Sequence, residues 1–219
     1  MVWRSCQPRR HRSLLLIMKV AVVIFHKTVG RYPENWIKSC MDSIKNQTFK
    51  NFDVFEVDYG MGNTQIYKGS NFENIHFKDH AYALNYLLNK VFSLGYDCAF
   101  NVNVDDFYSL DRFEKQLPYI EQGYDIISSN FNVIDENDIV QKPMDMASLD
   151  IKKEANQNHN IIAHPVVCYS KNFKGQLISS EIPRDDFELW KRCYSENQYK
   201  FIILPDYLLY YRVHSQKTS

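Results

Sequence analysis

The sequence predicts an α/β protein with a mostly parallel central sheet and helices on both faces of that sheet. Segments typical of strands alternate with segments of helical spacing, in the order strand, helix, strand, strand, helix, strand, helix, strand. The chain of 219 residues is long enough to bury one core, and its composition, 45% hydrophobic and 24% charged, is typical of a globular domain. We therefore expect one domain with a small C-terminal β/α subregion.

The first half of the chain supplies three of the expected strands and two helices. Residues 19–25 are a continuous, largely β-branched run, which is typical of a strand buried on both faces. Residues 52–58 predict the second strand, and residues 75–77 predict a short third one. Pro33 is suited to the first position of a helix. Apolar residues at helical spacing define the two helices: Trp36, Ile37, Cys40, Met41 and Ile44, and then Ala81, Leu84, Leu88 and Val91.

The second half of the chain continues the alternation and then departs from it. We expect a strand at residues 98–104, a helix at 110–120 and a further strand at 124–130. Residues 141–160 are polar and show no sustained period, which favours an irregular segment or a functional lid. Apolar positions then indicate one more amphipathic helix: Phe187, Leu189, Trp190 and Cys193.

Charge and cysteine content exclude several classes of protein. The 26 basic and 26 acidic residues cancel, so no net field favours nucleic acid or an anionic membrane as a partner. The five scattered cysteines lack a CxxC pair, which indicates reduced thiols used for packing rather than a disulfide frame or a zinc site. No segment approaches the roughly 20 apolar residues of a transmembrane helix. We predict a soluble, cytoplasmic protein.

Residues 1–17 differ in character from the rest of the chain. They join a basic stretch to a brief apolar run, which Lys19 interrupts, and they lack the long apolar segment and cleavage site of a signal peptide. We expect a dispensable or disordered extension, with Met18 as a natural start. A targeting or surface-binding role is the alternative.

Polar residues follow three of the predicted strands at the point where each strand ends. His26 and Asp58 end the first two strands, and the adjacent Asp105 and Asp106 follow the strand at 98–104. In an open α/β sheet, ligands bind in the crevice beyond the carboxyl ends of the strands, so these side chains are expected to converge there. The sequence contains neither GxGxxG after the first strand nor GxxxxGK[ST], so a phosphate would need another counter-charge. Carboxylate oxygens favour Mg²⁺ or Mn²⁺ in that role.

Four sequence motifs stand in a distinctive order along residues 18–217. They are "VAVVIFHKTVGRYPENWIKSCMDSIKNQTFKNFDVFEVDYG", "NVNVDDFYSLDRFE", "RDDFELW" and "YRVHSQKTS". Together they resemble the family 2 glycosyltransferases of the GT-A fold, with a DxD region, an E/D-D-x-x-L-W motif and a closing Y-R-x-H segment. The resemblance implies an inverting, metal-dependent enzyme that moves a sugar from a nucleoside-diphosphate sugar, a UDP-sugar, to a hydroxyl of a glycan or glycoconjugate.

The resemblance implies that residues 18–106 bind the donor. The donor-binding residues would be His26, Lys27, Asp58, Asn85, Asn103, Val104 and Asp106. Among them, Asp58 would contact the uracil or ribose, while His26 and Lys27 would line the base pocket. Asp105 would bind Mn²⁺ or Mg²⁺, and His214 would approach the metal or the pyrophosphate from the closing segment.

The acceptor side would occupy residues 107–219. Asp186 would be the general base that takes a proton from the acceptor hydroxyl, with Asp185 supporting it. His164 and Trp190 are further candidates on this side, and the 141–160 segment would border the acceptor. Because no acceptor-binding extension follows, we expect residues 18–219 to be the catalytic module of a longer polypeptide.

Sugar transfer of this kind is also consistent with the acidic residues themselves, independently of the resemblance to a family. Breaking a sugar–phosphate bond leaves negative charge on the diphosphate, which a divalent cation stabilises as a Lewis acid. An alcohol can attack the oxocarbenium-like sugar carbon if a carboxylate accepts its proton. One acid group for the metal and a second for the base are the minimal set, and the Asp105/Asp106 and Asp185/Asp186 pairs supply it.

Two departures from the family pattern concern the donor site. Asn103 stands where the motif has its first acid; its amide can hydrogen-bond a ribose hydroxyl but is a poorer metal partner, while Asp106 would orient the donor sugar or ribose. Leu84 stands where many relatives carry an arginine that would contact the base or phosphate.

Structural roles remain open for every candidate. Either aspartate pair could cap a following helix, since acids near helix N-termini are stabilising. His214 and His164 could be hydrogen-bonded structural histidines, and Asp58 could simply end its strand in a turn with Gly60. Trp190 could be a core residue rather than a sugar-stacking platform. A sugar nucleotidyltransferase and a non-catalytic sugar-nucleotide or glycan-binding module are the alternative functions.

Overall fold

The computed structural model of the protein describes residues 18–27, 29–157, 159–177, 185–195 and 199–215. The predicted N-terminal extension, residues 1–17, lies outside the described residues. The strands are β1 (Val20–His26), β2 (Phe52–Asp58), β3 (Asn71–Asn74), β4 (Cys98–Val102), β5 (Phe107–Tyr108), β6 (Ile126–Ile134), β7 (Val140–Met144), β8 (Cys168–Ser170) and β9 (Phe201–Arg212). The helices are η1 (Val29–Arg31), α2 (Glu34–Lys45), α3 (His80–Ser93), α4 (Arg112–Glu121), α5 (Ile151–Asn156), η2 (His164–Val166) and α6 (Asp185–Ser195).

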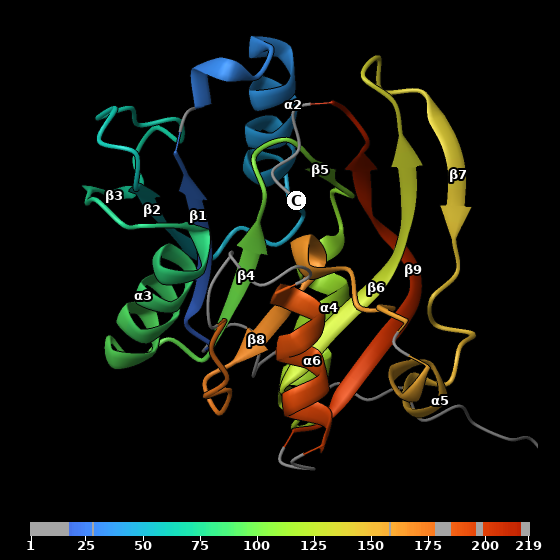
Figure 1. The fold of residues 1–219 in the computed structure, drawn as a ribbon. Coiled ribbons are helices and arrows are strands. Elements are labelled where there is room, and N and C mark those ends of the chain that lie inside the picture. The colour runs from blue at the N-terminus through green and yellow to red at the C-terminus, as the bar shows by residue number, and fades with distance from the viewer. Residues whose placement is uncertain (1–17, 28, 158, 178–184, 196–198, 216–219) are drawn as a thin grey trace, which may run out of the picture.

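All of these strands belong to one sheet, in the order β3-β2-β1-β4-β8-β6-β9-β5, with β7 paired to β6 (Figure 1). β1 pairs in parallel with β2 and β4, and β6 pairs in parallel with β9. β8 is antiparallel to both β4 and β6, so these two strands run in the same direction. The carboxyl ends of β1, β4, β6 and β9 therefore point to one edge, at the top of Figure 1. The predicted α/β class with a mostly parallel sheet is confirmed.

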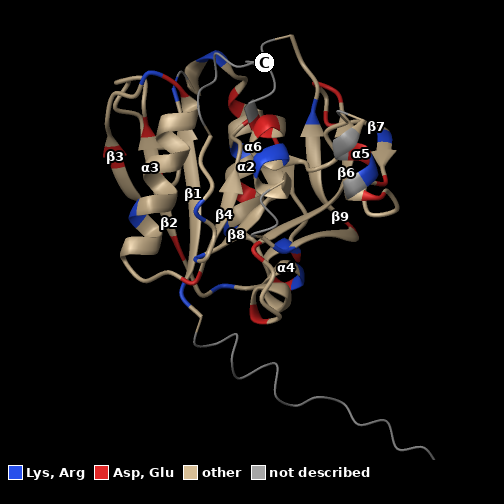
Figure 2. Ribbon diagram, turned by 60° about the horizontal axis from the view of Figure 1, so that its bottom comes forward, with Lys and Arg blue, Asp and Glu red and all other residues tan. Residues whose placement is uncertain are grey.

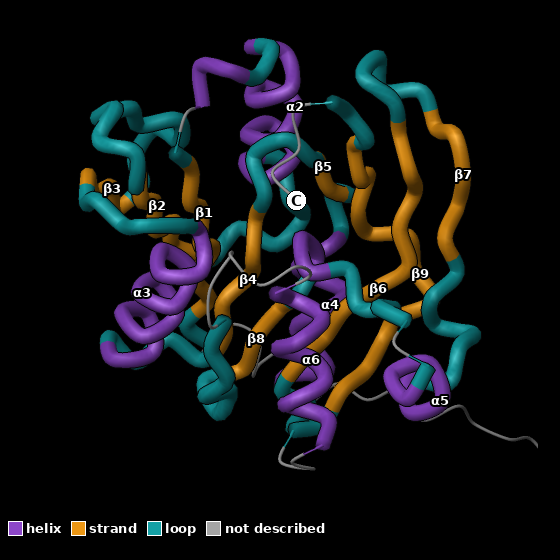
Figure 3. Tube along the Cα trace, in the orientation of Figure 1, coloured by secondary structure: helices purple, strands orange, loops and turns teal. Residues whose placement is uncertain are grey.

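Helices cover both faces of the sheet (Figure 3). Alternate residues of β1 point to opposite faces: Ala21 and Val23 join a core with α3 and α6, while Val22 and Ile24 join a core with α2 and α4. Because apolar side chains are needed on both faces, the strand is a continuous apolar run rather than an alternating one. The C-terminal strands β8 and β9 lie within the same sheet.

The third strand and the 141–160 segment differ from the predictions in place or in kind, and β4 and β6 differ in their limits, with β6 at Ile126–Ile134 instead of 124–130. The third strand is Asn71–Asn74 rather than residues 75–77, and β4 ends at Val102 rather than at residue 104. Within 141–160 the chain forms most of β7 and the short α5 instead of an irregular segment. Edge strands satisfy their backbone by pairing on one side without burying many apolar side chains, so hydrophobic pattern does not reveal them.

The surface and the cysteines agree with the composition. Figure 2 shows Lys and Arg interspersed with Asp and Glu over the ribbon, as the zero net charge leads one to expect. Cys40, Cys98, Cys168 and Cys193 are free and buried, which confirms the packing role for these four. Within the described part of the chain, no helix has the length and apolar character required to cross a bilayer.

Gln47 joins α2 to the start of α4 and is fully buried. Its Nε2 donates to the carbonyls of Ser43 and Ser109, and its Oε1 accepts from the backbone N–H of Phe113. We expect Gln47→Ala to lower the free energy of unfolding by about 2–4 kcal/mol, because three buried main-chain groups lose a partner. Urea unfolding followed by circular dichroism measures this change.

The matched control is Lys45→Ala, two residues earlier and exposed, which we expect to change stability by less than about 0.5 kcal/mol. Equal unfolding midpoints for Gln47→Ala and the control would mean that the amide does not hold the two helices together.

Candidate active site

The site residues predicted from strand ends gather at the carboxyl edge of the sheet. His26 and Asp58 end the neighbouring strands β1 and β2, and Asp105 and Asp106 follow β4 within four residues. His214 follows the end of β9 by two residues. The topology therefore brings the beginning, the middle and the end of the chain to one edge.

Asp105 and His214 contact each other directly. The Nε2 of His214 lies 3.0 Å from Oδ2 of Asp105, and each residue is 9% exposed. The imidazole packs between two rings near the start of α2, with centroid separations of 5.7 Å from Tyr32 and 4.9 Å from Trp36. Burial, and then the charge of Asp105, raises the pKa of the Tyr32 hydroxyl. These contacts fix the orientation of the imidazole toward the carboxylate.

Arg212, which the sequence interpretation did not select, is hydrogen-bonded to both Asp105 and Asp106. Its backbone N–H donates to Oδ1 of Asp106 at 2.8 Å, and its Nε donates to the carbonyl of Asp105 at 2.9 Å. The fully buried guanidinium lies 4.6 Å from the ring centroid of Trp36 and pairs with the carboxylate of Asp138. Arg212 is the arginine of the "YRVH" segment, so the motif already contained the signal.

Asp58 has its carboxylate turned into the loop that follows β2. Its Oδ1 accepts from the backbone N–H of Gly60 at 2.9 Å, and its Oδ2 accepts from that of Thr64 at 3.0 Å. This is the turn with Gly60 that the sequence left open as an alternative. A Cβ on Gly60 would lie 2.5 Å from the carbonyl oxygen of Lys27, so the close approach of the two loops requires glycine there. Lys27 itself is exposed.

His26 is buried against Glu56, a second residue that the sequence interpretation did not select. The Nε2 of His26 lies 3.1 Å from Oε1 of Glu56, and both side chains are buried. The same carboxylate accepts from the backbone N–H groups of Ile66 and Tyr67 and from the hydroxyl of Ser70. Glu56 therefore anchors the loop between β2 and β3, and an acid between the apolar residues Phe55 and Val57 was the signal for it.

The remaining donor-side residues, Asn85, Asn103 and Val104, make hydrogen bonds or packing contacts within the fold. The N–H of Asn103 donates to the hydroxyl of Tyr108 at 2.9 Å, and Val104 is buried in the core. The amide of Asn85 both donates to and accepts from the main chain of Leu177, at 2.7 and 3.1 Å. Asn85 thus ties α3 to the segment after β8.

Asp186 is the second residue of α6, and its carboxylate has two hydrogen-bond donors beside it. It accepts from Nδ2 of Asn160 at 3.0 Å and from the N–H of Phe187 at 2.7 Å. The side chain of its neighbour, Asp185, lies outside the described residues.

Tyr211 on β9 links the two acid groups electrostatically. Burial raises the pKa of its hydroxyl, and the charges of Asp106 and Asp105 raise it further. The charge of Asp186 acts in the same direction on the same hydroxyl. Tyr211 is therefore a residue on which the charges of both acid groups act.

His164 and Trp190 pack against each other rather than standing alone. Their ring centroids are 5.6 Å apart at an interplanar angle of 82°. Trp190 is 4% exposed and belongs to the core that includes Tyr169. Trp190 is therefore a core residue, as the alternative interpretation expected, and the ring of His164 packs against it.

Asp105 and His214 fit a divalent cation that is held partly by its substrate. Within the described residues no group of three or more His, Cys, Asp or Glu side chains could hold a metal ion. The pair offers one carboxylate and one imidazole, a donor set that suits Mn²⁺, and Mg²⁺ and Mn²⁺ usually complete their coordination with water and substrate phosphates. The side chains thus suit a cation that binds together with a diphosphate.

Sequence comparison finds a relative among proteins named glycosyltransferases. No protein-family model matches the sequence. The chain is similar to an uncharacterized glycosyltransferase of Methanocaldococcus jannaschii, with 28% identity over 202 residues that cover 83% of this chain and 67% of that protein.

Structure comparison finds the same fold in solved structures, two of which have a nucleotide or a nucleotide sugar bound. One is S. aureus TarS in complex with UDP, with a TM-score of 0.64 and 13% identity over 90% of this chain. Another is the mannosyltransferase PcManGT of Pyrobaculum calidifontis in complex with GDP-Man and Mn²⁺, with a TM-score of 0.61 and 12% identity over 91% of this chain. The fold is that of GT-A glycosyltransferases, and this chain spans 61% and 58% of the two solved chains.

Proposed function

We propose that this chain is an inverting, metal-dependent glycosyltransferase that moves a sugar from a UDP-sugar to a hydroxyl of a glycan or glycoconjugate. The relative named a glycosyltransferase and the GT-A architecture support an enzyme that uses a nucleotide sugar. The observation that carries the proposal is the contact between Asp105 and His214 at the carboxyl edge of the sheet, where Arg212 also holds Asp106. Residues 18–106 contribute the donor side, and residues 107–219 contribute the acceptor side.

The donor side holds the diphosphate. Asp105 and His214 would hold Mn²⁺ or Mg²⁺, and the Mn²⁺ in the PcManGT complex supports this assignment. When bound, the cation supplies Lewis-acid stabilisation of the charge on the departing nucleotide. Arg212 fixes the backbone of Asp105 and the carboxylate of Asp106, so both acids stay in place while charge develops beside them.

The acceptor side removes a proton. Asp186 takes the proton of the acceptor hydroxyl while that oxygen forms its bond to the sugar carbon, and the bond from that carbon to the diphosphate oxygen breaks. The hydrogen bond from Asn160 orients the carboxylate without neutralising it. A base of this kind, separate from the acids on the leaving-group side, suits a single displacement, which inverts the sugar carbon.

Two alternative functions make different demands on the same residues. A sugar nucleotidyltransferase needs a glycine-rich, basic phosphate loop after β1, whereas here Lys27 is exposed and Arg31 donates to the hydroxyl of its neighbour Tyr32. A non-catalytic binding module needs no acid at position 186. Donor turnover therefore separates these possibilities.

The test is release of UDP from UDP-glucose and UDP-N-acetylglucosamine, with GDP-mannose for comparison, in the presence of Mn²⁺ and in the presence of a chelator. We expect the wild-type chain to release UDP only with the metal, and Asp105→Ala to reduce this rate by about 10²–10³-fold. Asp206→Ala is the matched control, because this β9 carboxylate pairs with Lys115 instead. Nucleotide binding without any turnover would favour the binding module and end the proposal.

A further inference from the structure

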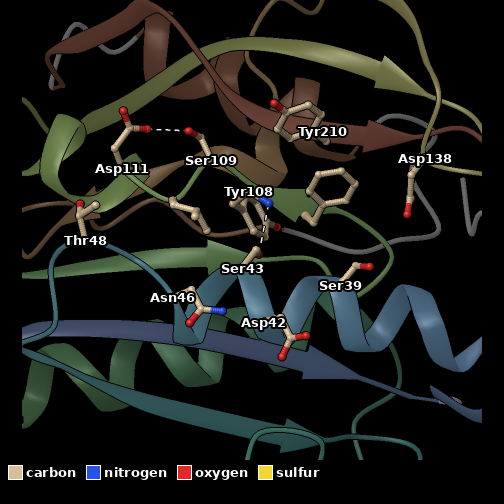
Figure 4. A pocket seen from close by; sticks show the side chains of 12 residues that line it. Ser39, Asp42, Ser43, Asn46, Thr48, Tyr108, Ser109, Asp111, Asp138 and Tyr210 are labelled. Atoms are coloured by element: carbon tan, nitrogen blue, oxygen red, sulfur yellow. Dashed lines mark hydrogen bonds between the residues drawn. The ribbon is translucent and has the colours of Figure 1, made fainter.

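A cavity of about 680 Å³ lies beside α2, and neither Asp105 nor His214 lines it. Figure 4 shows the twelve residues that line it. They come from one side of α2 and the segment after it, from β5 and the turn that follows, from the β6–β7 turn and from β9. Its volume is within the range of about 300–1,000 Å³ that is usual for small-molecule sites.

The lining combines aromatic rings with neutral polar groups. Phe107 and Tyr210 are stacked, with ring centroids 4.5 Å apart and an interplanar angle of 14°. Ser39, Asn46 and Thr48 present hydroxyl and amide groups on the α2 side of the cavity (Figure 4). Aromatic carbon surface flanked by hydrogen-bonding groups matches a ligand that has both C–H faces and hydroxyl edges.

Three carboxylates also line the cavity, and each has a cation next to it. Asp42 pairs with Lys38, Asp111 with Lys115, and Asp138 with Arg212. These ion pairs fix the carboxylates and leave further oxygen lone pairs for hydroxyl donors.

The charge of the lining selects against phosphate. None of the twelve residues that the structure describes around this cavity is Lys, Arg or His. The cations beside the three carboxylates are already paired with them, so the lining gives the diphosphate of a nucleotide sugar no positive partner. A neutral ligand rich in hydroxyl groups fits the charge, the rings and the volume together.

Two residues in the wall of the cavity are connected to Asp106, one by the chain and one through Arg212. Phe107 in its wall directly follows Asp106. Asp138, also in the wall, pairs with Arg212, whose backbone N–H donates to the carboxylate of Asp106. A ligand in the cavity would thus contact residues that are connected directly to the proposed site of sugar transfer.

We propose that this cavity binds neutral sugar units of the acceptor glycan that do not themselves react. The choice of an acceptor glycan as the ligand rests on the proposed function. The site is distinct from the donor site, because none of its lining residues is one that we assign to the donor or to the metal.

The experiment measures saturation-transfer NMR on the full chain with four neutral disaccharides: cellobiose, maltose, N,N′-diacetylchitobiose and mannobiose. Each is used at about 10 mM, which fills a site with a Kd of about 1 mM. We expect the wild-type chain to bind at least one of them. Ser39→Trp places an indole in the cavity and is expected to weaken that binding by at least about tenfold.

Lys45→Trp is the matched control: it adds the same ring at an exposed position of α2 that does not line the cavity, and binding is expected to persist. Asn46→Ala serves as a second test, because it truncates an exposed side chain and is expected to weaken binding without perturbing the fold. No signal from any disaccharide with the wild type, or equal signals from wild type and Ser39→Trp, would overturn the proposal.

This assay contains neither nucleotide nor metal. Its failure is therefore distinguishable from a failure of donor turnover, which would count against the proposed function alone.

Discussion

Asp186→Asn is expected to lower kcat for donor turnover by about 10²–10⁴-fold and to leave the KM for the UDP-sugar within about twofold of wild type. The amide has nearly the same shape as the carboxylate but cannot accept a proton at neutral pH. It keeps one oxygen to accept from the N–H of Phe187, so the start of α6 should persist. Steady-state kinetics of UDP release with Mn²⁺ measure both constants.

A purely structural role of Asp186 predicts the opposite pattern. If the carboxylate only stabilises the start of α6, the substitution should lower stability by about 0.3–1 kcal/mol, through loss of the negative charge at the helix N-terminus, and leave kcat unchanged. Glu188→Gln is the matched control, since this neighbour on the same helix pairs with Lys191 in partly exposed surroundings. Wild-type kcat in Asp186→Asn, with the control also unchanged, would remove Asp186 from the chemistry.

Arg212→Met is expected to lower the free energy of unfolding by about 2–4 kcal/mol and to reduce donor turnover. The substitution preserves apolar volume but removes the donors to the carbonyls of Asp105 and Asp135 and the ion pair with Asp138. Asp105 would then lose the restraint that holds its backbone. Urea unfolding and UDP release on the same preparation measure the two effects.

Two further variants separate the parts of the Arg212 network. Asp138→Asn removes only a partly exposed ion-pair partner, and we expect a loss of less than about 1 kcal/mol. Arg212→Lys keeps the charge but not the fork of donors, so it should recover only part of the stability. If Arg212→Met unfolds at the wild-type urea concentration and turns over donor at the wild-type rate, the arginine does not support the acid pair.

The elements that bury apolar side chains on two faces were the predictable part of the fold. β2 has the predicted limits, and β1 differs from its prediction by one residue at each end, because buried apolar side chains on both faces mark the two strands. β3 and β7 are polar edge strands, so their pairing depends on which backbone lies beside them and not on their own pattern.

The acids of the candidate site were predictable, but their partners were not. Position at a strand end is a local property, so Asp58 and Asp105 could be selected from sequence alone. The contacts of Glu56 and Arg212 depend on segments distant in the chain: Arg212 follows Asp105 by 107 positions. His214 was selected through the motif resemblance, since nothing local to it indicates a carboxylate 109 residues earlier.

A crystal structure with UDP and Mn²⁺, with anomalous diffraction collected at the manganese edge, tests the central claim most directly. The account predicts an anomalous peak at the side chains of Asp105 and His214, in contact with the diphosphate and facing the crevice that Asp186 shares. A nucleotide bound elsewhere, or a diphosphate at this edge with no manganese against Asp105, would contradict it.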